Sequence, residues 1–336
     1  MNERQDFERL VDEAMADTDL LAMRQVVEKE LLHYEIFHAL DGEGLLRELV
    51  FQGGTSLRLC RGSDRYSEDL DFAGGVDFDA SKMGKIAECV RKRIGERFGL
   101  DVSVSAKPAK AGDGLVKVDK WWIAIETSPG SQAMPKQRIK LEIANIPART
   151  RELRPILPNY ESAKAMPTVM VNTETLAEIM ADKVLAFPTS LLDNIGRPVE
   201  PGAAKIRHRD LWDLAWIAGK NIQLEPTLVA AKIGDYGVAG YADMLASAIE
   251  RVPEVVRSRE FRQQMGRFIG ASALAKTLDA PGHLDYMATT VGGLFSEMSA
   301  RLAPALAEVA AESAASAKAK TNAKAKERKP DLGPSQ

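Results

Sequence analysis

Apolar residues recur along the chain at two different spacings, and each spacing predicts a different kind of element. One stripe runs from residue 7 to residue 14 and a longer one from residue 21 to residue 40, with apolar side chains three or four positions apart. This is the spacing of one helix face. Gly42 and Gly44 end the second stripe. Residues 1–44 are therefore predicted to form a helical N-terminal segment that packs on the next domain.

From residue 45 to residue 158, short apolar runs alternate with helical stripes. This pattern predicts an α+β domain with a small mixed β-sheet flanked by helices. Its expected strands cover residues 48–52, 69–73, 101–105, 116–126 and 137–145, and its expected helices cover residues 55–61 and 79–98.

The second half of the chain is predicted to be mainly helical. Residues 149–167 are rich in proline and charge, which indicates a long connection, and the domain boundary is placed after residue 158. We expect an edge strand at residues 168–171, helices at 174–187 and 207–214, and four or five more up to residue 310, broken near Gly234, Pro253, Gly270 and Pro281. Residues 159–310 are thus a helical C-terminal domain. Residues 311–336 lack large apolar side chains and are expected to be a disordered tail.

Composition narrows the class of protein. With 45% hydrophobic and 28% charged residues, the chain resembles a soluble globular protein. It has no apolar run of transmembrane length and no secretion signal at its polar start, so we expect a cytoplasmic protein with no membrane partner. The net charge of −3 excludes a globally basic nucleic-acid coat but not a local basic groove. Cys60 and Cys89 have no metal-binding spacing, which argues against a zinc site.

The stretch from Phe51 to Phe72 carries the first candidate chemistry. Asp69 and Asp71 alternate with Leu70 on an expected strand, so the two carboxylates project from one face while the apolar side chains point into the core. Carboxylates so placed repel each other unless a cation lies between them, and Mg²⁺ prefers carboxylate oxygens. The spacing predicts a metal site.

A glycine turn precedes this strand. Gly53 and Gly54 let the backbone bring its N–H groups close to an anion at the start of a helix, and Thr55 and Ser56 can add hydroxyl donors. Glycine turn and D-x-D strand together predict nucleotidyl transfer, in which metal ions hold the triphosphate. Taken separately, the two features are more often a plain turn and a solvated strand face.

Two later helices carry charged residues that the same chemistry could use. Lys183 lies at the edge of the apolar face of the helix at 174–187, where a lysine ordinarily extends its ammonium group to solvent. Asp210 and Asp213 lie three positions apart, hence on one helix face, and Arg209 lies beside Asp210. An ion-pair network on the helix surface is the alternative interpretation.

The motifs GGTSLRL, at residues 53–59, and RYSEDLDF, at residues 65–72, resemble the signature of the AbiEii-type nucleotidyltransferases, which include the MenT toxins. This family is a branch of the DNA polymerase β-like superfamily. The match in order, from glycine turn to D-x-D strand to lysine helix to R-D-x-x-D-L helix, covers about residues 50 to 215. The resemblance implies a polymerase β-like nucleotidyltransferase domain followed by a mainly helical C-terminal lobe.

The resemblance also implies roles for single residues. Lys183 would contact phosphate, and Asp210 or Asp213 would orient it, with Arg209 assisting. A third carboxylate commonly completes the metal site in this superfamily, and Glu142, on the outward side of the strand at 137–145, is the candidate. A solvated glutamate is the alternative, and the neighbouring basic residues could instead form a nucleic-acid groove: Lys136, Arg138 and Lys140.

The function implied is transfer of a nucleoside monophosphate from an NTP to a hydroxyl. Two Mg²⁺ ions would be held by Asp69, Asp71 and Glu142, and the triphosphate by the segment Gly53, Gly54, Thr55 and Ser56. The family implies a toxin of a type IV toxin–antitoxin or phage abortive-infection system, with the 3′ acceptor end of tRNA as acceptor and a cognate antitoxin as partner. Three alternatives stay open: a protein hydroxyl, a small-molecule hydroxyl, or a non-catalytic binding module on the same fold.

Overall fold

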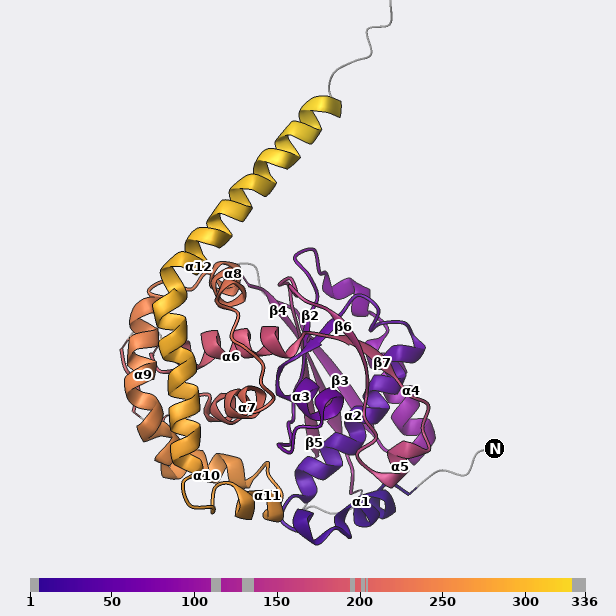
Figure 1. Cartoon of the computed structure of the whole chain (residues 1–336). Coiled ribbons are helices and arrows are strands. Elements are labelled where there is room, and N and C mark those ends of the chain that lie inside the picture. The colour runs from indigo at the N-terminus through magenta and orange to yellow at the C-terminus, as the bar shows by residue number, and fades with distance from the viewer. Residues whose placement is uncertain are drawn as a thin grey trace, which may run out of the picture.

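The computed structural model describes residues 6–109, 116–128, 136–193, 197–200, 203 and 205–327. The chain forms two lobes that lie side by side, one built on a sheet and one built of helices only (Figure 1). The helices of the sheet lobe are α1 (Phe7–Met15), η1 (Thr18–Leu20), α2 (Arg24–Gly42), α3 (Gly53–Arg61), η2 (Ala80–Met83), α4 (Ile86–Phe98) and α5 (Glu161–Lys164). Those of the helical lobe are α6 (Leu176–Ser190), α7 (His208–Ala218), α8 (Pro226–Tyr236), α9 (Tyr241–Arg257), α10 (Arg259–Gly266), α11 (Ala271–Lys276) and α12 (His283–Glu327). The mixed α+β class expected from the sequence is confirmed.

The sheet has seven strands in the order β3-β4-β5-β2-β1-β7-β6. They are β1 (Val50–Gln52), β2 (Leu70–Ala73), β3 (Val102–Lys107), β4 (Val118–Ile125), β5 (Gln137–Ala144), β6 (Glu152–Pro155) and β7 (Met170–Thr173). The central strand β2 runs antiparallel to β1 and parallel to β5. Because β2 and β5 are neighbours, the carboxylates that the sequence places on each strand share one surface.

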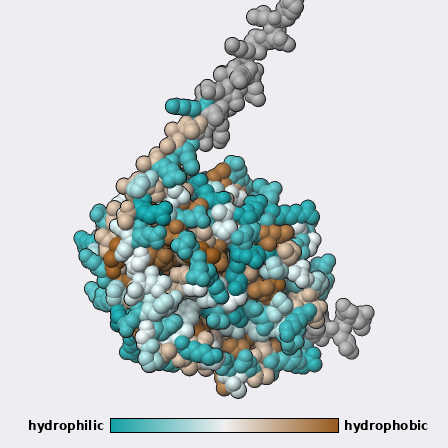
Figure 2. Space-filling view, viewed as in Figure 1, coloured by the Kyte–Doolittle hydropathy of each residue, from teal (hydrophilic) through white to brown (hydrophobic). Residues whose placement is uncertain are grey.

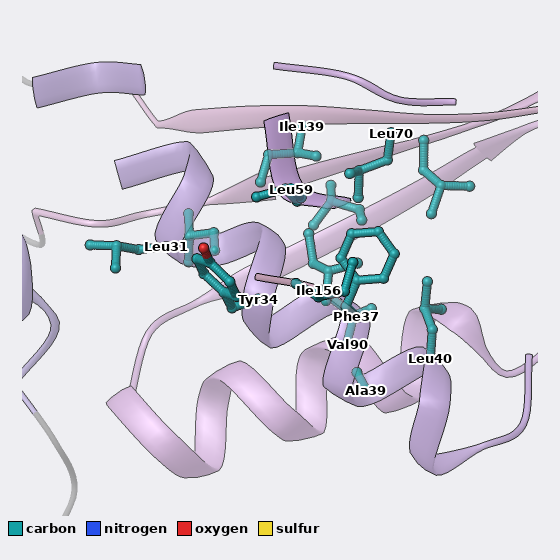
Figure 3. Packing of buried hydrophobic residues seen from close by; sticks show 14 of the residues in the cluster. Leu31, Tyr34, Phe37, Ala39, Leu40, Leu59, Leu70, Val90, Ile139 and Ile156 are labelled. Carbon is teal, nitrogen blue, oxygen red and sulfur yellow. The ribbon is translucent and has the colours of Figure 1, made fainter. Parts of the chain in front are cut away.

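One face of the sheet is apolar and closed by helices. Leu70 and Phe72 of β2, and Ile139, Leu141 and Ile143 of β5, are at most 1% exposed. α2 and α4 pack on this face with side chains such as Phe37 and Val90 (Figure 3). Burying this apolar surface at about 25 cal/mol per Å² stabilises the lobe and fixes the strand register. The polar side chains of the same strands are left on the opposite face, which we call the open face.

The helical lobe has its own apolar core. Phe187 of α6 and Phe295 of α12 are fully buried and stack with ring centroids 5.6 Å apart. One residue of each lobe packs in the core of the other lobe. Leu57 of α3 packs in the helical core, and Phe268, after α10, packs in the sheet core. This exchange fixes the orientation of one lobe against the other.

Several boundaries differ from those expected. The boundary after residue 158 falls between β6 and β7, two paired strands of the one sheet, and the helical core begins with α6. The expected edge strand is β7, which lies inside the sheet between β1 and β6. Pro253 lies within α9 instead of breaking it, because Val252, Val255 and Val256 pack in the core and hold the helix across the proline.

The C-terminal segment also differs from expectation. α12 continues through the part of the tail expected to be disordered as far as Glu327, and it projects beyond the two lobes in Figure 1. Residues 328–336 lie outside the described residues. Among the side chains of α12 that the structure describes, the last buried ones are Leu302 and Ala305.

Hydrophilic residues cover most of the face seen in Figure 2, and hydrophobic ones form small separate patches. In the part of the chain that the structure describes, no helix combines the length and apolar character needed to cross a membrane.

Removal of residues 312–336 should leave stability unchanged, because the described side chains beyond Ala305 are largely exposed. In contrast, Phe295→Ala removes a fully buried ring and should lower the free energy of unfolding by about 3–5 kcal/mol. Chemical denaturation of the two variants beside the wild type makes the comparison. A large stability loss in the truncated protein would show that the projecting end of α12 packs on the lobes.

Candidate active site

The open face of the sheet carries a row of oxygen donors at its centre. In the register of the sheet, Glu142 of β5 lies beside Asp71 of β2, and Asp71 lies beside Gln52 of β1. Asp69 lies two residues before Asp71 and therefore on the same face. The three predicted metal ligands are thus brought to one surface, as the pattern of β2 and β5 indicated.

The glycine turn lies directly beside this row. Gly53 has a φ of +76°, and a Cβ atom there would come 3.1 Å from Asp71 Oδ2. A Cβ atom on Gly54 would meet Arg65 Nη2 at 2.2 Å, so a larger residue there would displace the guanidinium group that Asp213 holds. α3 begins at Gly53 with no side-chain cap, which leaves its first N–H groups for an anion in the adjoining cleft.

The two hydroxyls after the glycines have other partners. Thr55 Oγ1 donates to the carbonyl oxygen of Asp69, and Ser56 Oγ donates to the carbonyl oxygen of Gly53 at 2.9 Å. Both residues are 1% exposed and neither lines the cleft. The hydroxyl of Thr55 therefore ties the turn to the carboxylate strand, and the hydroxyl of Ser56 closes the turn itself, so neither is directed into the cleft as the prediction assumed.

Two lysines lie among the carboxylates. Lys140 Nζ lies 2.8 Å from Glu142 Oε2 and 3.3 Å from Asp69 Oδ2, and Lys120 Nζ lies 2.7 Å from Glu142 Oε1. Burial would raise the pKa of Glu142, but the two ammonium groups outweigh this and lower it below its ordinary value. Glu142 is therefore ionised, with both oxygens paired to lysine.

Asp71 is the least favourably placed charge in the row. Burial, followed by the neighbouring carboxylates of Asp69 and Glu142, raises the pKa of Asp71 to about 7. A cation bound between these groups would relieve the repulsion.

The donor set fits a hard divalent cation such as Mg²⁺. Asp69 and Asp71 supply carboxylate oxygens, and Gln52 Oε1 is buried without a hydrogen-bond partner in the adjacent register position. With the side chains as they stand, the described residues do not assemble three His, Cys, Asp or Glu side chains around one point. The reason is visible at Lys140, whose ammonium group takes the position between Asp69 and Glu142.

Opposite the sheet, a buried ion network joins α6, α7 and the loop before β2. Lys183 Nζ lies 2.9 Å from Asp210 Oδ1 and 2.7 Å from Asp213 Oδ2. Arg65 binds Asp213 with two hydrogen bonds of 2.7 Å, and Arg207 Nε lies 2.7 Å from Asp210 Oδ2. Both aspartates that the sequence left as alternatives therefore bind Lys183.

The charges of this network support one another. Burial would lower the pKa of Lys183, but Asp210 and Asp213 outweigh it, and its pKa lies above the ordinary value. Burial would raise the pKa of Asp210, but Lys183 and then Arg207 hold it well below its usual range. All of these groups are charged at neutral pH, so Lys183 presents a permanent cation at the cleft wall.

A cleft of about 690 Å³ separates the carboxylate row from this network. It is lined by Gly53, Gly54, Asp69, Asp71, Lys140, Glu142, Lys183, Lys205, Arg207, Arg209 and Asp210, among others. α7 begins at the cleft with Arg207 as its uncapped N-cap residue. Arg209 lies over the ring of Phe268 at 4.9 Å and lines the same cleft. Two helix N-termini and several cations therefore face a row of carboxylates, which suits a metal-bound polyphosphate.

Some of these residues were missed or given another role from the sequence. Arg65 is part of the motif at residues 65–72, but its partner Asp213 lies 148 positions away, and no local pattern joins them. Gln52 gives no signal other than its position one residue before the glycine pair. Lys140 was considered only as part of a basic nucleic-acid groove, and its ion pairs with Asp69 and Glu142 were not foreseen, since alternation assigns a face but not an ion pair.

The cleft is bounded by paired carboxylates, a glycine turn and a cationic helical wall, and it lies on a mixed sheet. This is the arrangement of a nucleotidyltransferase. The sequence profile of the nucleotidyl transferase AbiEii toxin family of type IV toxin–antitoxin systems matches residues 37–286, and the chain belongs to this family.

One solved structure agrees with this assignment at the level of the fold. The nucleotidyltransferase toxin MenT4 from Mycobacterium tuberculosis is similar with a TM-score of 0.53 and 18% identity, over 91% of this chain and 99% of that one. JHP933 from Helicobacter pylori aligns over 86% of this chain and 98% of its own, with 16% identity and a TM-score of 0.43. A search of curated protein sequences gives no match.

Replacing Asp213 should lower the free energy of unfolding more than replacing Asp210. Asp213 is fully buried and pairs with Arg65 and Lys183, so Asp213→Ala leaves the buried Arg65 without a carboxylate and Lys183 with Asp210 alone, and should cost about 3–5 kcal/mol of stability. Asp210→Ala should cost less, since the Arg207 side chain is 58% exposed and can turn to water. Urea denaturation compares the two variants. Equal losses would contradict the division between a structural Asp213 and a site-facing Asp210.

The pKa of Asp71 predicts a pH-dependent stability difference. Because its folded-state pKa is raised, the folded protein binds the extra proton between about pH 4 and 7, and its stability falls as pH rises through that range. Asp71→Asn removes this effect and should be more stable than the wild type by about 4 kcal/mol above pH 7, with little difference near pH 4. Denaturation at several pH values without divalent metal measures it. A constant difference across the range would show that Asp71 is ionised throughout.

Proposed function

We propose that this toxin transfers a nucleoside monophosphate from an NTP to the 3′ hydroxyl of tRNA. The observation that carries the proposal is the in-register pair Asp71 and Glu142, with Asp69 beside them, facing the Lys183–Asp210 pair across one cleft. The glycine turn and two helix N-termini between them suit the triphosphate.

Acidic residues of the cleft would bind metal ions, and its basic residues and N–H groups would bind the phosphates. Asp69 and Asp71 would hold two Mg²⁺ ions, with Glu142 completing the set when its lysine partners turn aside. Bound ions would polarise the phosphate and make the acceptor hydroxyl more acidic. The N–H groups at Gly53 and Gly54 would contact the phosphates, and Lys183, Arg207 and Arg209 would offset the charge of the departing pyrophosphate.

The reaction has a simple balance. The acceptor oxygen forms a bond to the α-phosphorus, the bond from the α-phosphorus to the bridging oxygen breaks, and pyrophosphate leaves with the electron pair. The hydroxyl proton passes to solvent. Holding both reactants in one cleft contributes through orientation, and the cations stabilise charge that develops on the leaving group.

The partners follow from the family and the fold. As a member of a type IV toxin–antitoxin family, the chain would act with a cognate antitoxin. A nucleic-acid acceptor is favoured by basic side chains that line the cleft, such as Lys205 and Arg209, because the phosphates of a nucleic acid would offset their charge.

Transfer should depend on Asp69. Purified protein is incubated with Mg²⁺, each labelled NTP in turn, and either total tRNA or total protein. Wild type should label the acceptor end of tRNA, and Asp69→Asn should reduce the rate by about a hundredfold or more. Asp243→Asn, which changes an exposed carboxylate on α9, is the matched control and should keep full activity.

The labelled product decides between acceptors. Label on protein alone would replace tRNA by a protein hydroxyl. Label on neither, from a folded protein, would contradict transferase activity toward macromolecules.

A further inference from the structure

The open face continues from the carboxylate row onto β4 and β3. Trp122 of β4 lies in register between Lys140 of β5 and Ser105 of β3, and Lys140 Nζ contacts Asp69. These four residues therefore form a row across the sheet. With neighbouring strands about 4.8 Å apart, Trp122 lies roughly 10 Å from the strand of Asp69.

Trp122 lies outside the hydrophobic clusters of the described part of the chain. The indole is half-buried and packs in none of the three hydrophobic clusters that the described residues form, although its neighbour Trp121, on the other face, is 4% exposed in the sheet core. Tyr236 of α8 packs on the open face at Val118 and Ala144, one end of these strands, and no cluster extends to Trp122. A large aromatic side chain in this setting offers a ring surface to a ligand.

The side chains around Trp122 are basic. Alternation and register place Lys107, Lys120, Arg138 and Lys140 on this part of the open face, against the one carboxylate of Glu142 among the described residues of β3, β4 and β5 there. Lys107 and Arg138 are exposed, on either side of the tryptophan row. Lys120 and Lys140 already pair with Glu142, so the exposed Lys107 and Arg138 are the cations that flank the aromatic ring, and they match a chain of phosphates that carries flat bases.

We propose that this surface, which we call the Trp122 platform, holds the single-stranded end of the acceptor nucleic acid. The base next to the reacting nucleotide stacks on Trp122, and the phosphates before it contact Lys107 and Arg138, so that the terminal hydroxyl reaches the carboxylate row. The inference rests on the proposed function, because it assumes a nucleic-acid acceptor, and it adds where the acceptor binds and that its end is unpaired.

Equilibrium binding of a fluorescein-labelled single-stranded RNA to the full-length protein, without NTP or divalent metal, tests the platform. Fluorescence anisotropy should show Kd rising roughly fivefold to a hundredfold in Trp122→Ala, the usual range for one lost stacking contact, and staying near wild type in Trp122→Phe. The Lys107→Ala/Arg138→Ala double variant should also bind more weakly, and its plot of log Kd against log salt should be flatter by about 1.4, since each single-strand phosphate contact contributes about 0.7.

Matched controls separate the platform from general charge. Arg91→Ala/Lys92→Ala removes two exposed cations of α4, which packs on the closed face, and should bind RNA like the wild type. Single-stranded DNA of the same sequence shows whether the platform reads the ribose, and Trp122-dependent binding of either strand supports it. Equal binding of a blunt duplex, unaltered Kd in Trp122→Ala, or an equal loss in the α4 variant would each overturn it.

Two outcomes distinguish failure of the Trp122 platform from failure of the proposed transfer reaction. If Asp69→Asn loses transfer to tRNA while Trp122→Ala binds RNA normally, the platform is wrong and the function stands. If single-stranded RNA binds in a Trp122-dependent way but no nucleic acid is ever labelled, the surface is real and the proposed reaction is wrong.

Discussion

The buried contact between Arg65 and Asp213 is the interaction on which the site depends. It joins the loop before the carboxylate strand to α7 of the other lobe, and both side chains are at most 3% exposed. A charged pair so far from water is stable only when every donor and acceptor is used, and here Lys183 and the carbonyl oxygen of Tyr66 complete the set. The same contact sets the distance between the sheet and the lysine across the cleft. Folding of the helical lobe and assembly of the site are therefore one event.

The active-site cleft is built from charges that the fold stabilises unequally. On the helical side, cations and carboxylates alternate and all stay ionised. On the sheet side, carboxylates outnumber their partners, and the pKa of Asp71 is raised to about 7. The protein thus concentrates its electrostatic strain where a cation is expected to bind, which is how active sites commonly differ from the rest of a fold.

Local pattern predicted the parts of this site and not their assembly. The alternation of Asp69 and Asp71 with apolar residues predicted both the strand and its two faces, and the same alternation placed Glu142 on the open face. Alternation has no information on sequence-distant partners, so the pairing of Arg65 with Asp213 and the lysines beside Glu142 could be seen only in the structure. Thr55 and Ser56 show a second limit, since residue type indicated hydroxyl donors for a ligand, but both hydroxyls donate to backbone carbonyl oxygens of Asp69 and Gly53. The low helix propensity of proline predicted a helix break at Pro253, but packing of α9 in the core keeps the helix continuous there.

Lys140 has a consequence for how the carboxylate row is filled. Since its ammonium group lies between Asp69 and Glu142, a divalent ion reaching that position replaces an existing charge instead of entering an empty space. Binding of a divalent ion there would exchange one ammonium group for one metal ion. The local charge would then rise by one unit instead of two. The displaced ammonium stays tethered to β5 beside Trp122, at the border between the triphosphate cleft and the platform. A cation held between Asp69 and Glu142 would leave the Lys140 ammonium free for a phosphate of the acceptor, and the two binding events would then be coupled.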